Sequence, residues 1–448
     1  MNSYIERVLE EVKAKDAGEP EFIQTVEEVL SSISPLVDAH PEYEDFALLE
    51  KMVEPERTIE FRVPWEDDNG KIHIQRGYRV QFNGAIGPYK GGLRFASNVN
   101  LSIMKFLGFE QTFKNSLTTL PMGGAKGGSD FDPNGKSDNE IRRFCQSFMT
   151  ELYRHIGPNL DVPAGDIGVG GREIGYLFGQ YRRIRGNFEN GVLTGKGRTY
   201  GGSLIRPEAT GYGAVYYLEA ILRHEGDTLQ GKRVAVSGFG NVAWGVCKKL
   251  AERGAFPVTI SGPDGYIYDP DGIVTDEKIN YLLTMRSSGR NRAQDYADKF
   301  GVQFFPGQKP WGEKVDIIMP CAMQNDVHME QAQQIVANGI KYYIEVANMP
   351  TTNDALRFLM SQPNMVIAPS KAVNAGGVLV SGLEMSQNSE RYSWTAEEVD
   401  EKLHRIMTGI HDDSAACAEQ YGLGYNLVAG ANMCGFQKVA QAMMEQGI

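Results

Sequence analysis

The sequence feature that most constrains the fold is a glycine-rich turn between an apolar strand and a helix. Residues 232–237 (Lys-Arg-Val-Ala-Val-Ser) predict a short buried strand, and residues 242–253 predict a helix. Further along the chain, apolar strand-like segments at 257–261, 315–319 and 340–345 alternate with helix-like segments. Such alternation is typical of βαβ units, whose strands are parallel. The second half of the chain is therefore expected to fold around a parallel sheet.

The turn between the strand and the helix has the residues that a dinucleotide site requires. Its sequence is Gly238-Phe239-Gly240-Asn241-Val242-Ala243, a G-x-G-x-x-A pattern. Gly238 permits the tight turn, Gly240 lets the backbone approach a pyrophosphate, and Ala243 permits close packing of helix on strand. The first turn of the helix would then offer unpaired N–H groups to phosphate oxygens. Because the flanking strand and helix are both present, a dinucleotide site is favoured over a purely structural turn.

Three lysines are notable in a chain whose formal net charge is −12, because an anionic substrate would need local positive charge. Lys90 and Lys126 lie beside glycines that let a backbone approach a ligand. Lys114 shares a helix face with Gln111 through i,i+3 spacing. A desolvated ammonium beside other ammoniums has a lowered pKa, which suits acid–base chemistry. Asp166, in a loop of small residues, is a candidate proton acceptor; the alternative is that these lysines are solvated surface charges.

The first half of the chain has a different pattern, with helices at its start and strands after them. The first 50 residues have amphipathic helical spacing. The alternating segments 57–63 and 78–82 predict strands, with a turn at 67–70. A helix is expected at 101–120, a glycine-rich loop at 121–129, a hinge between two domains at 186–206, and a last helix at 427–445.

Composition excludes several classes of protein. The five cysteines are scattered and never in C-x-x-C spacing, and the seven histidines show no ligand spacing, so neither a disulfide framework nor a metal site is expected. The acidic balance disfavours nucleic-acid and membrane partners. No apolar run approaches the roughly 20 residues of a membrane span, and the N-terminus lacks the pattern of a secretory signal. A cytoplasmic location is expected.

Several long blocks occur together and in order along the whole chain. They are Pro88–Arg94, Leu120–Gly128, Val162–Asp166, Arg206–Gly213, Glu345–Pro350 and Pro369–Val378. These blocks resemble the signature segments of hexameric glutamate dehydrogenases in the Glu/Leu/Phe/Val dehydrogenase family, and are most similar to the clostridial NAD-linked branch. The resemblance implies reversible oxidative deamination of L-glutamate to 2-oxoglutarate and ammonium, with hydride transfer to a nicotinamide dinucleotide.

The resemblance also implies an architecture. The fold class would be α/β, with an N-terminal α/β substrate domain and a Rossmann-like doubly wound cofactor domain separated by a cleft. Residues 1–200 would form the substrate-binding and oligomerisation domain, and residues 201–424 the cofactor domain. Residues 425–448 would form a helix that packs back on the first domain. Six copies of the chain would assemble into a homo-hexamer.

Residue by residue, the resemblance implies roles at the substrate. Lys126 would polarise the carbonyl and activate the water of the imine step, and Asp166 would shuttle the proton to and from the amino group. The α-carboxylate would be held by Lys114, Gln111 and the backbone of Gly165, and the γ-carboxylate by Lys90 and Ser381. Two substrate carboxylates need at least two cationic contacts, which leaves a third lysine for catalysis.

At the cofactor, the resemblance places Thr210 and Asn241 along the dinucleotide and Asn348 near the nicotinamide ribose. The choice between NAD and NADP stays open. Asp264 would hydrogen-bond an adenosine ribose and repel a 2′-phosphate, which favours NAD, or would be a turn residue before a glycine. For NADP, three downstream arginines are the candidates, in a segment comparable to one that related NADP-linked enzymes use: Arg286, Arg290 and Arg292.

Two rival functions remain as alternatives. A dehydrogenase for leucine, valine or phenylalanine would replace the γ-carboxylate contacts with apolar residues, whereas Lys90 and Ser381 are polar. A catalytically silent dinucleotide-sensing protein on the same fold would be expected to lack Lys126 or Asp166, and both are present.

Overall fold

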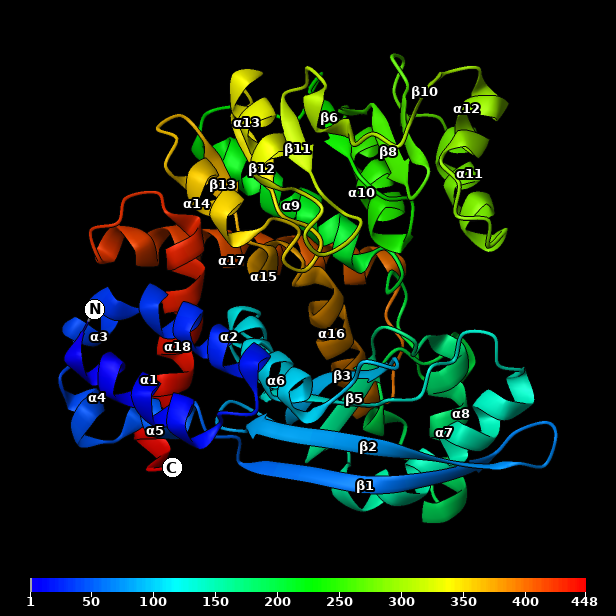
Figure 1. Cartoon of the computed structure of the whole chain (residues 1–448), viewed down its shortest axis with the longest axis vertical. Helices are drawn as coiled ribbons and strands as arrows, with labels where there is room; N and C mark the ends of the chain where they lie inside the picture. Colours follow the sequence, from blue (N-terminus) through cyan, green and yellow to red (C-terminus); the bar gives the residue numbers. More distant parts are fainter. Residues whose placement is uncertain (1) are drawn as a thin grey trace. The chain divides into compact units, whose positions relative to one another are not determined.

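Each half of the chain folds around its own β-sheet in the computed structural model, which describes residues 2–448 (Figure 1). The first unit contains the residues up to Leu204 together with Val378–Val399 and Asn432–Ile448. The second unit contains Ile205–Gly377 and Asp400–Ala431. The first division falls within the segment expected to be a hinge. The chain then returns to the first unit at Val378–Val399, a segment that we had expected to belong to the cofactor domain.

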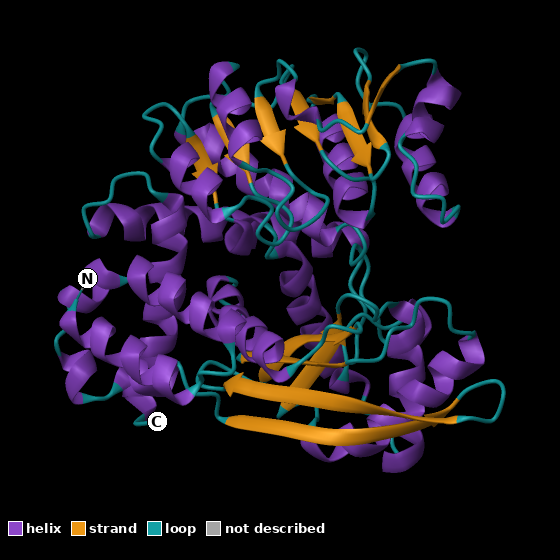
Figure 2. Ribbon diagram, in the orientation of Figure 1, coloured by secondary structure: helices purple, strands orange, loops and turns teal. Residues whose placement is uncertain are grey.

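The sheet of the first unit has the strand order β1-β2-β4-β3-β5. Its strands are β1 (Arg57–Glu66), β2 (Ile72–Asn83), β3 (Tyr89–Phe95), β4 (Gly124–Ser129) and β5 (Asp161–Gly165). The first three in this order are antiparallel, whereas β3 runs parallel to both β4 and β5. The predicted strands at 57–63 and 78–82 and the turn between them are confirmed as the long β1–β2 hairpin (Figure 2).

The prediction of a loop at 121–129 is wrong for most of its length, because Gly124–Ser129 is the buried strand β4. The glycines are there for packing rather than for turning. A Cβ on Gly91 of β3 would lie 1.6 Å from the carbonyl oxygen of Ala125, and a Cβ on Gly124 would lie 2.0 Å from Thr112 Oγ1 of the neighbouring helix. Strand β3 and the helix that carries Thr112 thus approach β4 more closely than a side chain at these glycines would permit. The small-residue loop expected around Asp166 is likewise strand β5 up to Gly165.

Helices surround this sheet and supply most of the first unit's core. Side chains from β1, β3, α7 and α8 form one cluster, with Phe95, Phe131, Phe144 and Phe148 at its centre. The helices are α1 (Ser3–Lys15), α2 (Pro20–Ser32), α3 (Ser34–Asp38), α4 (Glu42–Asp45), α5 (Leu48–Met52), α6 (Leu101–Leu117), α7 (Asp138–Leu152), α8 (Gly171–Arg185), α16 (Gly376–Glu390) and α18 (Leu427–Gln446). Short 3-10 turns lie at Tyr153–His155, Asn190–Val192 and Arg198–Tyr200.

The C-terminal part of α18 packs against helices from the start of the chain (Figure 1). Asn432 Nδ2 donates to Ser32 Oγ at 2.8 Å, and the carbonyl of Gly435 accepts from Ser116 Oγ at 2.9 Å. The ring of Phe436 stacks on Phe113 with centroids 5.9 Å apart. These contacts run along one helix face, so the end of the chain belongs to the core of the first unit.

The second unit contains the parallel sheet that the alternating pattern predicts, with the order β13-β12-β11-β6-β7. Its strands are β6 (Arg233–Val236), β7 (Phe256–Pro257), β11 (Ile317–Met319), β12 (Tyr342–Ile344) and β13 (Val366–Ala368). One face of this sheet packs against α13 (Met329–Ala337) and α14 (Asn353–Met360) through a buried apolar cluster. A mixed α/β fold with a Rossmann-like parallel sheet is confirmed.

The remaining elements of the second unit are a second, smaller sheet and further helices. A small antiparallel sheet has the order β10-β9-β8, with β8 (Thr259–Gly262), β9 (Gly265–Tyr268) and β10 (Gln303–Pro306). Its other helices are α9 (Ala209–His224), α10 (Asn241–Glu252), α11 (Asp276–Ser287), α12 (Gln294–Phe300), α15 (Ser370–Val373), α17 (Ala396–Gln420) and the turn at Pro310–Gly312. Within residues 2–448, none of the helices combines the length and apolar character needed to cross a membrane.

A buried ion pair holds three strands of the first unit together. Arg79 on β2 donates through Nε to Asp161 Oδ2 at 2.9 Å, and through a second nitrogen to the other carboxylate oxygen. Its third nitrogen donates to the carbonyl of Gly91 on β3 at 3.1 Å, and Gln81 also donates to Asp161. Both charged side chains are fully buried. Every polar group of the pair therefore has a partner, as burial of charge requires.

Replacing Arg79 with methionine should destabilise the protein by about 3–5 kcal/mol, because the Asp161 carboxylate would be left buried without its cation. Urea unfolding followed by circular dichroism measures this loss. The matched control is Arg154→Met, which removes an exposed arginine from a surface pair with Glu151. An unfolding midpoint in Arg79→Met equal to that of the control would contradict the account.

Candidate functional site

The candidate site of the first unit is built on three neighbouring strands. Lys90 lies on β3, Lys126 lies on β4, and Asp166 follows directly after β5. The register pairs Leu93 with both Gly127 and Gly165, so the three strands are neighbours at this level. Lys90, Lys126 and Asp166 are far apart in the sequence but belong to strands, or follow a strand, that are neighbours in the sheet.

Lys126 and Asp166 form an ion pair, with Nζ and Oδ2 3.1 Å apart. Arg94 donates through Nε to the same carboxylate oxygen at 2.8 Å. Lys126 is only 5% exposed. Burial lowers the pKa of Lys126, the Asp166 carboxylate opposes that shift, and Arg94 adds to it. The structure therefore bears out the lowered lysine pKa, although burial and an arginine cause it rather than the other lysines.

For Asp166, burial by itself would raise the pKa. The positive charges of Lys126 and Arg94 outweigh that effect and bring the pKa down to about 2. The carboxylate is therefore ionised at neutral pH and sits within proton-transfer distance of the Lys126 ammonium. It can accept a proton only when its contacts to the two cations weaken, which makes Asp166 an acceptor that depends on what else enters the site.

A second cluster contains Lys90 and Ser381, as predicted, and also Thr194, which was not predicted. Lys90 Nζ donates to Thr194 Oγ1 at 2.8 Å, and the Thr194 and Ser381 hydroxyl oxygens are 2.5 Å apart. All three side chains are buried. An ammonium and two hydroxyls in one dry position form a donor set that suits a carboxylate oxygen.

Gln111 and Lys114 lie on α6, half-buried and three residues apart, which confirms that they share a helix face. Gln111 Nε2 donates to Asn115 Oδ1 at 2.7 Å. The amide nitrogen of Asn115 in turn donates to the carbonyl of Lys90 at 3.0 Å. This chain of hydrogen bonds fixes α6 against β3. The backbone of Gly165, at the end of β5, pairs with β3.

Two residues of this unit were missed by sequence reasoning, Arg94 and Thr194. Arg94 is the last residue of the block Pro88–Arg94, but nothing local indicates that its guanidinium turns toward Asp166. Thr194 lies in the glycine-dense segment that was expected to be a hinge. The only local signal is the sequence Thr194-Gly195-Lys196, in which a hydroxyl and an ammonium flank a glycine.

In the second unit, the turn at 238–243 has the backbone that the motif predicts. Gly238 has φ of +79°, the left-handed conformation that favours glycine. Gly240 is the N-cap of the twelve-residue helix α10, and no side chain caps that helix. A Cβ built on Gly240 would meet no atom within 4 Å, so there is open space beyond it. Uncapped N–H groups facing open space fit the pyrophosphate of a dinucleotide.

The other predicted cofactor residues lie in two groups of the same unit. Asn241 and Val242 begin α10, and Ala243, the third residue of the helix, is buried. Thr210 lies in the first turn of α9, beside Gly377, whose Cβ would lie 2.6 Å from its hydroxyl. The glycine-rich turn fixes the positions of Asn241, Val242 and Ala243, and the packing of α9 against Gly377 fixes that of Thr210.

Asn348 is exposed, and its side-chain oxygen accepts from Asn374 Nδ2 at 2.7 Å. The oxygen of Asn374 is buried and has no hydrogen-bond partner within residues 2–448. Such an acceptor is costly unless a ligand supplies a donor, and a nicotinamide amide is a donor of that kind. Asn374 was quoted within a resembling block but given no role.

Asp264 lies in the two-residue turn between β8 and β9. Its carboxylate accepts from the backbone N–H of Ala293 at 2.8 Å and of Gln294 at 3.1 Å. Of the competing arginines, Arg290 pairs with Asp295 at 2.9 Å and Arg292 donates to Gln294 at 2.7 Å. The side chain of Asp264 thus ties the β8–β9 turn to the start of α12, while its remaining lone pairs stay available to a ribose.

Among residues 2–448, no group of three or more His, Cys, Asp or Glu side chains is arranged to hold a metal ion. The five cysteines are all buried and free.

Two family models match the chain. The model described as Glutamate/Leucine/Phenylalanine/Valine dehydrogenase matches residues 201–447. The model described as Glu/Leu/Phe/Val dehydrogenase, dimerisation domain, matches residues 55–183. Together they cover most of both units.

Individual relatives match the chain from end to end. An NAD-specific glutamate dehydrogenase of Clostridium symbiosum is 79% identical over 448 residues, which cover 100% of both chains. An NADP-specific glutamate dehydrogenase of Haemophilus influenzae is 54% identical and covers 99% of this chain and 98% of its own length. A solved structure of a glutamate dehydrogenase is 79% identical, with a TM-score of 0.98 and full coverage of both chains.

The environment of Lys126 leads to a prediction about its reactivity. Because burial lowers its pKa, Lys126 should acylate with a midpoint below the ordinary lysine value of about 10.4. In Asp166→Asn the midpoint should fall further, because the carboxylate that raises the pKa is lost. Competitive labelling with acetic anhydride over a pH series, read by mass spectrometry, measures both. Exposed Lys136 is the reference for reagent activity. A wild-type midpoint at or above the ordinary value would contradict the assignment.

Proposed function

The chain belongs to the Glu/Leu/Phe/Val dehydrogenase family, and from this premise we infer that it is a glutamate dehydrogenase. It is an oxidoreductase that interconverts L-glutamate with 2-oxoglutarate and ammonium. The observation that carries this inference is the pair of buried cationic clusters in the first unit, one at Lys126 and one at Lys90. Apolar amino acids would need no charge at the second of these positions.

We propose that the cluster of Lys90, Thr194 and Ser381 binds the γ-carboxylate of the substrate. All three side chains are buried, and Thr194 Oγ1 lies 2.8 Å from Lys90 Nζ and 2.5 Å from Ser381 Oγ. A carboxylate entering this position replaces lost hydration with charge-assisted hydrogen bonds, whereas a methyl group would leave the donors without partners. Lys114, Gln111 and the backbone of Gly165 would hold the α-carboxylate.

The catalytic pair follows from the same geometry. Lys126, as an ammonium, stabilises negative charge that develops on the carbonyl oxygen, and after losing a proton it activates the water that attacks the imine carbon. Because burial lowers its pKa, Lys126 gives up this proton more readily than an exposed lysine does. Asp166 takes the proton of the substrate amino group once the incoming substrate has weakened its contacts to Lys126 and Arg94.

When bound, a nicotinamide dinucleotide accepts or supplies the hydride of the reaction. The chain's own contribution is to bind and orient it. The N–H groups at the start of α10 would hold the pyrophosphate, with Gly238, Gly240, Asn241, Val242 and Ala243 forming the turn. Thr210 would contact the cofactor. Asn348, which accepts a hydrogen bond from Asn374, would bind the nicotinamide ribose.

The two alternative functions have less support. A leucine, valine or phenylalanine dehydrogenase would leave the buried Lys90 ammonium facing an apolar side chain, which is costly. A silent dinucleotide sensor would have no use for the charged pair of Lys126 and Asp166, which costs desolvation energy without serving the fold.

We further propose that the chain assembles as a homo-hexamer and works in the cytoplasm. The first rests on the resemblance and on the match of residues 55–183 to a dimerisation domain. The second is supported by five cysteines that are all free.

The function is tested by oxidation of NADH by the purified protein with 2-oxoglutarate and ammonium, in wild type and in Lys126→Ala. We expect turnover that requires both substrates in wild type, and a loss of at least about a thousandfold in the variant, because base and electrostatic stabiliser are lost together. Lys136→Ala, which removes an exposed lysine, should retain wild-type activity. Normal turnover in folded Lys126→Ala would refute the catalytic assignment.

We propose NAD as the preferred cofactor, with NADP as the alternative, because Asp264 places negative charge after β8 while Arg290 and Arg292 have protein partners. Asp264→Asn removes that charge but keeps an oxygen that accepts from Ala293. The ratio of kcat/KM for NADH over NADPH should fall about tenfold in this variant, since the 2′-phosphate is no longer repelled. Exposed Asp271→Asn is the control. An unchanged ratio would show that Asp264 does not select the cofactor.

A further inference from the structure

A buried lysine–glutamate pair lies next to the cluster proposed to bind the γ-carboxylate. Lys196 Nζ is 2.7 Å from Glu384 Oε1, and both side chains are fully buried. The ammonium also donates to Asn388 Oδ1 at 2.9 Å and to the carbonyl of Leu193. All three of its protons thus have partners. The pair lies outside the residues assigned to substrate or cofactor.

The ion pair forms hydrogen bonds with the backbone on both sides of Thr194. The carbonyl of Leu193 accepts from the Lys196 ammonium, and the N–H of Gly195 donates to Glu384 Oε2 at 3.0 Å. The N–H of Lys196 donates to the other carboxylate oxygen at 3.4 Å. The residue before Thr194 and the two after it are therefore tied to one ion pair. Only the side chain of Thr194 remains to face Lys90.

Helix α16 carries Glu384 of the ion pair and also Ser381 of the cluster proposed to bind the γ-carboxylate. Ser381, Glu384 and Asn388 are spaced i, i+3 and i+7, so they lie on one helix face. Ser381 Oγ touches Thr194 Oγ1 at 2.5 Å, while Glu384 holds the backbone on either side of Thr194. Helix α16 and the ion pair thus help to set the distance between the two hydroxyls, together with the carbonyl of Pro163 on β5, which accepts from the N–H of Thr194 at 3.0 Å.

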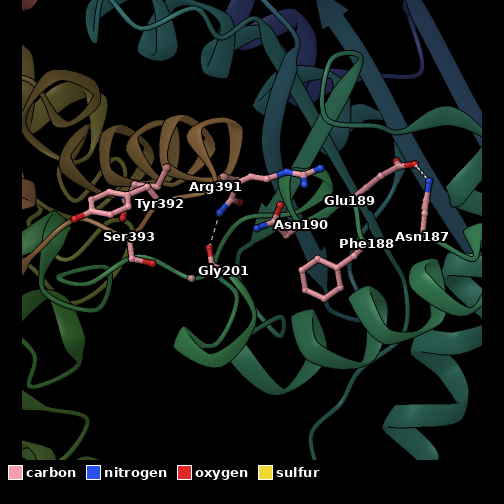
Figure 3. A pocket seen from close by; sticks show the side chains of 11 residues that line it. Asn187, Phe188, Glu189, Asn190, Gly201, Arg391, Tyr392 and Ser393 are labelled. Carbon is pink, nitrogen blue, oxygen red and sulfur yellow. Dashed lines mark hydrogen bonds between the residues drawn. The ribbon is translucent and has the colours of Figure 1, made fainter.

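The same helix holds the segment further along. Asn388 Nδ2 donates to the carbonyl of Gly201 at 2.7 Å, the dashed line that ends at Gly201 in Figure 3. Gln387 Nε2 donates to Ser203 Oγ at 2.9 Å. Gly201, Asn388 and Gln387 also line an open pocket of about 510 Å³ (Figure 3). The network therefore runs from the buried Thr194 to the surface, and it fixes the segment at each end.

Stability gives little reason for an ion pair at this place. Burial lowers the pKa of Lys196, and Glu384 opposes that shift, so the charge is retained only through its partner. Well-packed apolar side chains of similar volume are often as stabilising as a buried pair. What an apolar pair cannot do is bind the N–H of Gly195 and the carbonyl of Leu193, which fix Thr194.

We propose that Lys196 and Glu384 are positioning residues that determine selectivity for the γ-carboxylate, by holding Thr194 and Ser381 at the separation which that group requires. This inference rests on the proposed function. Neither residue touches the substrate; both act through Thr194. A shift of the 193–196 segment would leave Lys90 without its hydroxyl partner and would loosen the site without emptying it.

The test compares two substrates of equal chain length, 2-oxoglutarate and 2-oxopentanoate, which lacks the terminal carboxylate. In the double variant Lys196→Met/Glu384→Leu, the ratio of kcat/KM for the first over the second should fall at least about tenfold, because charge-assisted hydrogen bonds to the carboxylate are weakened. KM for 2-oxoglutarate should rise, while the KM for 2-oxopentanoate and the Kd for NADH should stay as in wild type.

Two further variants separate positioning from stability. Lys105→Met removes another buried, ion-paired lysine of the same unit, which contacts Asp16 and Glu19, so it should lower stability without changing the selectivity ratio. Glu384→Gln keeps the shape and an oxygen for Lys196 but turns an amide nitrogen toward Gly195. It should lower the ratio in the same direction, and it serves if the double variant does not fold.

The outcomes are distinct. Wild-type protein that does not turn over 2-oxoglutarate would refute the proposed function itself. A second outcome is an active wild type with a selectivity ratio that is unchanged in folded Glu384→Gln or in the folded double variant. That result would overturn the positioning role of Lys196 and Glu384 but not the proposed function. A ratio that falls equally in Lys105→Met would also overturn the positioning role, because a general loss of stability would then explain the effect.

Discussion

The structure depends on keeping ammonium groups charged while they are buried. A buried cation is tolerated only when its protons are bonded to protein oxygens, since the loss of hydration is otherwise too costly. Lys126 meets this condition through Asp166, Lys90 through Thr194, and Lys196 through Glu384 and Asn388. The partners differ in kind. A carboxylate balances the charge of the ammonium, whereas a hydroxyl leaves that charge available to an anionic ligand.

Glycine is what allows these cations to come together. Strands β3 and β4 and helix α6 meet at distances that no Cβ would permit at Gly91 or Gly124. Lys126 lies on β4 two residues after Gly124, and its burial lowers its pKa. In the second unit glycine has another task, because Gly238 makes a left-handed turn and Gly240 leaves the start of α10 open. One residue type thus serves packing in one unit and ligand access in the other.

The fold of the second unit was predictable because its signals are local. The strand, the G-x-G-x-x-A turn and the helix are contiguous in sequence, and the order of strands and helices implies a parallel sheet. Strand β4 was mistaken for a loop because its glycines are required by close packing against β3 and α6, which are separate segments of the sequence. The full site escaped prediction for the same reason. Thr194 meets Ser381 across a separation of 187 residues, and Lys196 meets Glu384 across 188.

The central claim is that buried charge in the first unit prepares glutamate for direct hydride transfer to a nicotinamide dinucleotide. The measurement that tests it most directly uses L-glutamate carrying deuterium at C2, oxidised NAD and purified protein, with the reduced cofactor analysed by mass spectrometry. The account predicts one deuterium in each molecule of reduced cofactor, because the hydride passes from carbon to carbon without exchange with water. Reduced cofactor without deuterium, or no reduction at all by the folded protein, would contradict it.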